Sequence, residues 1–276
     1  MLLNVLAVGD VVGEGGQDIL ARRLREVKRE EDIHFTVVNG ENASGVGLTP
    51  RQARGMYDAG ADVITLGNHT WNRIQIADFL DKDPYILRPA NYAGRVPGRG
   101  FGMFDGPRGL RIGVMNLMGR LELNSNLDSP FKAANQLLRG TEAQRCDLVL
   151  VDFHAEATSE KGALAWYLDG RVQALWGTHT HVPTADGQIL PKGTGFLTDL
   201  GMTGPRRSVS RPKLKETHCP FLRFNATGIC ATLLSLSLIQ TSTPAALPSI
   251  QSPDGASRSG GWTWRSKSGG KGAFFP

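Results

Sequence analysis

LeuLeuAsnValLeuAlaValGlyAsp, residues 2–10, is an apolar run that ends in a glycine and a carboxylate, and this arrangement decides the fold class. Similar short runs, each followed by a turn and often by a helical stretch, recur up to about residue 201. Runs rich in Val, Ile and Leu are typical of buried strands, and their alternation with helices predicts an α/β domain. We expect strands at residues 2–8, 35–38, 63–66, 112–117, 148–153, 172–176 and 195–198.

Helical stretches follow several of these runs. One is predicted by a core-facing stripe with spacing i, i+4, i+7 among charged residues, formed by Leu20, Leu24 and Val27. A second is expected to begin at Thr49 and Pro50, an N-cap followed by proline, and to end at Gly60. A third is expected from Ser159 onward.

The length of 276 residues suits one large α/β domain. From residue 251 onward Gly, Ser, Lys and Arg dominate, which predicts a disordered tail. We therefore expect one domain over residues 1–250 and a tail over residues 251–276. Within the domain, the strict alternation LeuSerLeuSerLeu at 234–238 predicts a half-buried strand, which we expect in a sheet beyond the first.

Composition favours a cytoplasmic protein without a membrane partner. No apolar run approaches the ~18 residues that a membrane-spanning helix needs. The amino-terminal run lacks the basic segment and cleavage site of a signal peptide. Three cysteines without CxxC spacing, Cys146, Cys219 and Cys230, indicate neither a disulfide framework nor a zinc ribbon. The net charge of +5 comes largely from the basic tail, so it is weak evidence for nucleic-acid binding.

The chemistry is expected where the strands end. Ligands of α/β sheets gather at the carboxyl ends of the strands, so side chains far apart in sequence can converge there. The polar residues found at these ends are Asp10, Glu41, Asn42, Asn68, His69, Asp152, His154, His179 and His181.

These residues indicate a metal site. Imidazole, carboxylate and amide groups together suit Mn²⁺, Fe²⁺ or Zn²⁺ rather than Mg²⁺ or Ca²⁺. The number of groups exceeds what one catalytic ion needs, and a carboxylate such as Glu41 can bridge two ions about 3.5–4 Å apart. We therefore expect two divalent ions, iron or manganese in first place and zinc as the alternative.

Seven motifs between residue 1 and about residue 205 resemble a known group, the YmdB family of calcineurin-like metallophosphoesterases. They are GlyAspValValGly, AsnGlyGluAsnAla, GlyAsnHisThrTrp, ArgProAlaAsnTyr, AspPheHisAlaGluAlaThrSerGluLys, GlyThrHisThrHisValProThrAlaAsp and AspLeuGlyMetThrGlyPro. The resemblance implies a four-layer α/β sandwich, in which two mixed sheets pack face to face between helices. It also implies an enzyme similar to bacterial 2′,3′-cyclic-nucleotide phosphodiesterases.

The same resemblance implies a role for each site residue. The first metal would be held by Asp10, Glu41, Asn42 and His181, and the second by Glu41, Asn68, His154 and His179. His69 would bind no metal and would lie near the substrate. A water that bridges the two ions would lose a proton and attack phosphorus, while His69 protonates the leaving oxygen.

Several other residues outside the proposed ligand set can be interpreted in more than one way or as structural. Asp152, Glu156, Asn39, Thr180 and Asp199 either contact the ligands or are solvated polar groups. His34 and His218 are interpreted as structural or surface histidines. Gly13, Gly15 and Gly16 match neither GxGxxG nor a Walker motif, and we expect them in a loop that passes close to the metals.

Two other functions compete with a phosphodiesterase. A regulatory protein could use the metal site for sensing with little turnover, but the complete hydrolytic set, His69 included, favours an enzyme. Nucleic-acid binding by the basic tail would give salt-sensitive affinity that survives chelation. The expected partner is a small phosphodiester, such as a cyclic nucleotide. An RNA or a regulatory protein stays open as a partner, and we expect a homo-oligomer.

Overall fold

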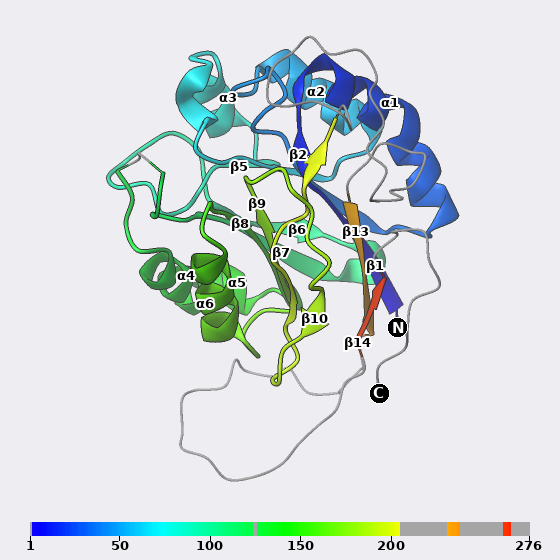
Figure 1. The fold of residues 1–276 in the computed structure, drawn as a ribbon, viewed down its shortest axis with the longest axis vertical. Coiled ribbons are helices and arrows are strands. Elements are labelled where there is room, and N and C mark those ends of the chain that lie inside the picture. The colour runs from blue at the N-terminus through cyan, green and yellow to red at the C-terminus, as the bar shows by residue number, and fades with distance from the viewer. Residues whose placement is uncertain (1, 124–125, 205–230, 238–261, 266–276) are drawn as a thin grey trace.

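Two six-stranded sheets face each other in the computed structural model, which describes residues 2–123, 126–204, 231–237 and 262–265 (Figure 1). The strands of the first sheet are, in spatial order, β14 (Trp262–Arg265), β13 (Ala231–Ser237), β1 (Leu2–Val8), β3 (Phe35–Asn39), β4 (Val63–Thr65) and β5 (Ile86–Leu87). Those of the second are β10 (Gln188–Ile189), β11 (Gly195–Leu197), β9 (Ala174–Thr178), β8 (Leu148–His154), β7 (Arg111–Met118) and β6 (Phe101–Asp105). A short parallel pair, β2 (Asp10–Val11) and β12 (Met202–Thr203), follows β1.

Helices cover the outer faces of both sheets (Figure 1). The first sheet is covered by α1 (Gly13–Glu30), α2 (Pro50–Ala59) and α3 (Ile76–Lys82). The second is covered by α4 (Pro130–Arg139), α5 (Thr141–Gln144) and α6 (Thr158–Leu168). Two 3-10 turns are η1 (Thr70–Asn72) and η2 (Pro107–Gly109). No helix in the described part of the chain is long and apolar enough to cross a membrane.

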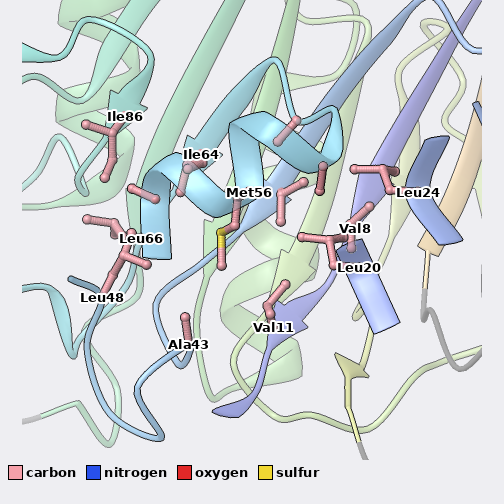
Figure 2. Packing of buried hydrophobic residues seen from close by; sticks show 14 of the residues in the cluster. Val8, Val11, Leu20, Leu24, Ala43, Leu48, Met56, Ile64, Leu66 and Ile86 are labelled. Carbon is pink, nitrogen blue, oxygen red and sulfur yellow. The ribbon is translucent and has the colours of Figure 1, made fainter. Parts of the chain in front are cut away.

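Strand β1 is buried on both faces because successive side chains of a strand point in opposite directions. Val5 and Ala7 pack between the two sheets. Leu6 and Val8 pack on the other side, against the helices. Figure 2 shows this outer core, where Val8 lies beside side chains of α1.

Strand β8 divides its side chains in the same way. Leu148 and Leu150 point toward the first sheet, and Val149 and Val151 point toward α4 and α6. The two sheets therefore share one inner core, and each has its own outer core beneath helices. The predicted four-layer sandwich is confirmed.

The central strands run parallel. β1, β3, β4 and β5 are parallel neighbours, as are β7, β8, β9 and β11. Their carboxyl ends, and the turns that follow them, therefore collect along one edge of each sheet.

Most predicted elements occur within two residues of their expected ends. Helix α2 begins as predicted, because Thr49 and Gln52 form a capping box, and it ends at Gly60 in the left-handed conformation. The run expected at 172–176 is strand β9 two residues later, Ala174–Thr178. A two-residue shift keeps the same side chains on the same face, since the side-chain period of a strand is two.

Two expectations were wrong. The described part of the alternating run, residues 234–237, pairs antiparallel with β1, with Leu2 opposite Ser237, and so joins the first sheet. Alternation shows that one face is buried but does not identify the neighbouring strand. The glycines expected in a loop belong to the first turn of α1, where a Cβ on Gly16 would lie 2.4 Å from the carbonyl oxygen of Thr203.

Some predictions fall wholly or partly outside the described residues, among them those for His218, for Cys219 and Cys230, and for most of residues 251–276. Within that last segment β14 pairs antiparallel with β13. The domain boundary at residue 250 stays a prediction.

Candidate metal centre

The predicted site residues all follow strands whose carboxyl ends meet between the two sheets. Their positions are Asp10 at the start of β2, Glu41 and Asn42 after β3, Asn68 and His69 after β4, His154 at the end of β8, and His179 and His181 after β9. The turns after strands of the first sheet supply Glu41, the two amides and His69, and the short strand β2 that follows β1 supplies Asp10. The second sheet supplies the other three histidines.

One group of side chains surrounds Nε2 of His154. This nitrogen lies 3.1 Å from Oε1 of Glu41, 2.9 Å from Oδ1 of Asn68 and 3.1 Å from Nδ1 of His179. The ligand-type atoms of Glu41, His154 and His179 all lie within 4.8 Å of one another. These four residues are the set predicted for the second metal.

A second group surrounds the side-chain amide of Asn42. Its Nδ2 lies 3.0 Å from Oε1 of Glu41, 3.1 Å from Nε2 of His181 and 3.5 Å from Oδ1 of Asp10. All three of these atoms can act as acceptors. A half-turn of the Asn42 amide exchanges Nδ2 for Oδ1, the atom that binds cations, and the two orientations are assigned by hydrogen bonding. These four residues are the set predicted for the first metal.

Glu41 belongs to both groups. Its Oε1 contacts both Asn42 and His154, while Oε2 accepts a hydrogen bond of 3.2 Å from the backbone N–H of His69. A Cβ on Gly67 would lie 2.2 Å from Oε2 of Glu41 and 2.3 Å from Nε2 of His154. The glycine of the GlyAsnHis motif is therefore needed for this close approach.

The carboxylates of this centre are held in the charged form by the histidines. Burial raises the pKa of Asp10, but a hydrogen bond to His181 and the charge of His154 together lower it to about 2. Burial likewise raises the pKa of Glu41, and attraction to His154 lowers it below its usual value. Burial lowers the pKa of His154, yet attraction to Glu41 outweighs burial and raises that pKa to about 9.

The other two histidines shift in opposite directions. Burial and the charge of His154 lower the pKa of His179. Burial also lowers the pKa of His181, but its hydrogen bond and attraction to Asp10 raise it overall. The histidine that lies against Asp10 is therefore the more readily charged of the two.

A buried polar chain orients His154 from behind. Its Nδ1 donates to Oγ1 of Thr178 at 2.9 Å, and that hydroxyl donates to Oδ1 of Asp152 at 2.8 Å. Asn39 and Thr65 of the first sheet both donate to Oδ2 of the same carboxylate. With the proton held at Nδ1, the Nε2 of His154 is left facing the candidate metal site.

The structure shows the surroundings of Asp152 and Glu156, whose roles the sequence left open. Asp152 is fully buried, which excludes a solvated carboxylate, and burial raises its pKa to about 6 against the hydrogen bonds from Thr65 and Thr178. Glu156 is exposed, but its Oε2 lies 3.0 Å from Nε2 of His179. With Nε2 of His179 in contact with Glu156, the other ring nitrogen, Nδ1, faces the centre. Glu156 contacts a ligand-type histidine directly and Asp152 reaches one through Thr178, as outer partners of metal ligands commonly do.

The sequence interpretation missed Thr178 and Thr65. Thr178 directly precedes His179, but a threonine in a buried strand has an ordinary packing explanation. The usable signal was that Asp152 and His154 are two residues apart on β8 and so share one face. His34 is structural as expected, since its Nδ1 accepts a hydrogen bond of 3.2 Å from the backbone N–H of Asn4.

The donor set fits divalent cations. Asp10, Glu41 and His154 are fully buried, and Asn42 nearly so. Buried charges are normally paired or coordinate metals, and mixed imidazole, carboxylate and amide ligands suit iron, manganese or zinc. The contacts among these atoms are short enough for them to share bound ions.

Comparison with known proteins identifies the family of this chain and a relative named as a phosphodiesterase. A family model described as "YmdB-like protein" matches residues 6–224. The chain is 48% identical over 204 residues to the 2′,3′-cyclic-nucleotide 2′-phosphodiesterase of Bacillus subtilis (strain 168), covering 74% of this chain and 76% of that protein.

Solved structures agree with the fold. A crystal structure of a hypothetical protein from Thermus thermophilus superposes with a TM-score of 0.72 at 36% identity, covering 86% of this chain and 94% of that one. A crystal structure described as a novel phosphatase of Mycoplasma pneumoniae superposes with a TM-score of 0.67 at 35% identity, covering 73% of each chain.

Metal binding to the metal-free protein should release protons at about neutral pH, since metal ligands must be deprotonated. The pKa of His154 is raised to about 9, so its imidazole is protonated at neutral pH. The affinity for Mn²⁺ should therefore rise as the pH is raised from neutral and level off only above about 9, where the proton is lost before the metal binds. Calorimetric titration in two buffers of different ionisation enthalpy measures the released protons.

His34→Gln is the control, since it removes a half-buried histidine that has no contact with the centre. It should leave proton release unchanged. Affinity that did not depend on pH, with no proton released, would contradict the predicted protonation of His154.

Proposed function

This chain belongs to the YmdB-like protein family, a family of phosphoester hydrolases that use divalent metal ions, and from this membership we propose that it is a two-metal phosphodiesterase. The single observation that carries the proposal is Glu41, whose carboxylate contacts both groups of ligand-type side chains. A carboxylate in this position can bridge a pair of ions about 3.5–4 Å apart.

In the proposed site four side chains would hold each ion. Asp10, Glu41, Asn42 and His181 would hold one ion, and Glu41, Asn68, His154 and His179 the other. Two bound divalent ions supply an acidified water as nucleophile and neutralise charge on the phosphoryl oxygens. The chain itself orients the ligands through Thr178 and Glu156 and surrounds the carboxylates with buried groups.

We propose 2′,3′-cyclic nucleotides as the substrate class, as in the name of the Bacillus subtilis relative. A cyclic phosphodiester needs one P–O bond broken by water, and the departing ribose oxygen must then receive a proton. An alkoxide is a poor leaving group, so general acid catalysis is of most value there. Iron or manganese is the proposed metal, because both accept a mixed nitrogen and oxygen ligand set.

His69 is the proposed proton donor. It is half-buried, and its backbone N–H donates to Glu41, which keeps the ring at the edge of the centre. Nε2 of His69 lies 3.3 Å from Nδ2 of Asn68, whose Oδ1 faces His154. Because an amide NH₂ group only donates, this contact makes Nε2 the acceptor and leaves the proton of a neutral ring at Nδ1. In the proposed acid step the imidazolium form of His69 would give one proton to the leaving oxygen and return to this neutral form.

Glu41→Gln should disrupt both metals at once, because a neutral amide bridges two cations far less well than a carboxylate does. Asp10→Asn, the matched change at a carboxylate of one group only, should weaken mainly one metal. Elemental analysis of the purified variants, with hydrolysis assays on a 2′,3′-cyclic nucleotide, measures both effects.

Retention of two metal equivalents at wild-type affinity in Glu41→Gln would make the bridging assignment wrong. A wild-type protein that binds two metals without hydrolysing phosphodiesters would instead favour the regulatory alternative.

His69→Ala should leave both metals in place and lower kcat for a cyclic nucleotide by ~10²–10⁴-fold, the usual worth of general acid catalysis. An activated aryl phosphodiester has a better leaving group and should suffer less. Steady-state kinetics on both substrates, together with metal analysis, measure the difference, and His34→Ala is the control.

Loss of metal from His69→Ala would make His69 a ligand. Full activity on the cyclic nucleotide with both metals retained would remove His69 from the mechanism.

A further inference from the structure

The turn after β9 has an unusual backbone. His179 has φ of 102° and His181 has φ of 64°, both in the left-handed region that favours glycine. Such conformations are costly for other residues and persist only where the surroundings hold them in place. Something must therefore hold this turn, and the contacts of the intervening Thr180 identify it.

Thr180 donates two hydrogen bonds to the carboxylate of Asp199. Its Oγ1 donates to Oδ2 of Asp199 at 2.8 Å, and its backbone N–H donates to the same oxygen at 3.3 Å. The other carboxylate oxygen, Oδ1, accepts a hydrogen bond of 2.7 Å from the backbone N–H of Gly201. The backbone of Gly201 thus holds the carboxylate of Asp199 in place, and this carboxylate holds Thr180 in the middle of the turn.

Lys161 neutralises this carboxylate from the opposite side. The lysine belongs to α6 and is fully buried, and its Nζ lies 2.6 Å from Oδ2 of Asp199, which is itself 1% exposed. Its stem crosses β9 at Gly177, where a Cβ would lie 2.8 Å from Cδ of Lys161. The glycine of the GlyThrHisThrHis motif is required first by the neighbouring backbone, because the same Cβ would lie 1.9 Å from the carbonyl oxygen of Thr198. A buried charge that is paired and hydrogen-bonded in this way stays ionised and rigid.

We propose that Thr180, Asp199 and Lys161 form a positioning unit that sets the two imidazoles of the His179–His181 turn for metal binding. The inference rests on the proposed function, because it takes His179 and His181 as ligands. His179 reaches the group around His154, and His181 reaches the group around Asn42. One turn would therefore control both metals. Its conformation is set partly by Asp10, which accepts a hydrogen bond of 3.2 Å from the backbone N–H of His179, and partly by the three residues of the unit, which are not proposed ligands.

The contacts also explain why Asp199 does not act as a metal ligand itself. Oδ2 is occupied by Lys161 and Thr180, and Oδ1 by Gly201. A carboxylate held on both oxygens cannot turn toward the neighbouring centre without breaking these bonds.

Thr180→Val tests the unit most sharply, because valine keeps the shape of threonine and leaves the Lys161–Asp199 pair intact. Titration of the metal-free protein with Mn²⁺ should show an affinity about 10–100-fold weaker for both ions, the usual effect of losing an outer partner of metal ligands. Thermal unfolding of the metal-free variant should stay close to wild type. Thr180→Ser keeps the hydroxyl and should keep wild-type affinity.

Thr194→Val is the matched control. Thr194 is fully buried, and its Oγ1 donates to the carbonyl oxygen of Val172 at 2.7 Å, at the amino ends of β9 and β11. The same chemical change there should lower the unfolding temperature and leave Mn²⁺ affinity unchanged. Equal loss of affinity in Thr180→Val and Thr194→Val would overturn the inference, since a general loss of stability would explain both.

His181→Ala separates the inference from the function on which it rests. Weak Mn²⁺ binding by His181→Ala with normal binding by Thr180→Val would overturn the positioning unit and leave the proposed function standing. Normal binding by both variants would overturn the ligand assignment, and the inference with it.

Discussion

The carboxylates of Asp10 and Glu41 are fully buried where the carboxyl edges of the two sheets meet, and the rest of the structure depends on how their charge is balanced. An uncompensated carboxylate in such a place is strongly unfavourable. The groups that surround these two are imidazoles and amides, which can share a cation with a carboxylate. In the proposed function, bound metal ions would stabilise this arrangement, and the same interaction would make it a reaction centre.

The two-sheet architecture makes this concentration of polar groups feasible. Asn39 and Thr65 come from the first sheet, while Asp152 and Thr178 come from the second, and their hydrogen bonds join the sheets directly beneath the centre. Deeper in the inner core the two sheets meet through apolar side chains. The candidate site is thus confined to one edge of a largely apolar interface. A fully satisfied polar network also rigidifies the groups that it connects.

Much of this could be predicted from the sequence. Each proposed ligand follows an apolar run, and the carboxyl ends of parallel strands share an edge, so their convergence needed no knowledge of tertiary contacts. The partner of a strand could not be predicted in this way, and residues 234–238 were assigned to the wrong sheet. The role of Lys161 was equally hidden, because its partner Asp199 is 38 residues away and lies on a different element. Such contacts depend on how α6 packs across β9.

Anomalous diffraction from crystals of the manganese-loaded protein would show directly whether Glu41 lies between two metal ions. We expect two anomalous peaks about 3.5–4 Å apart, with the carboxylate of Glu41 between them. His179 and His181 should contact different ions. A single peak, or two peaks of which only one contacts Glu41, would contradict this expectation.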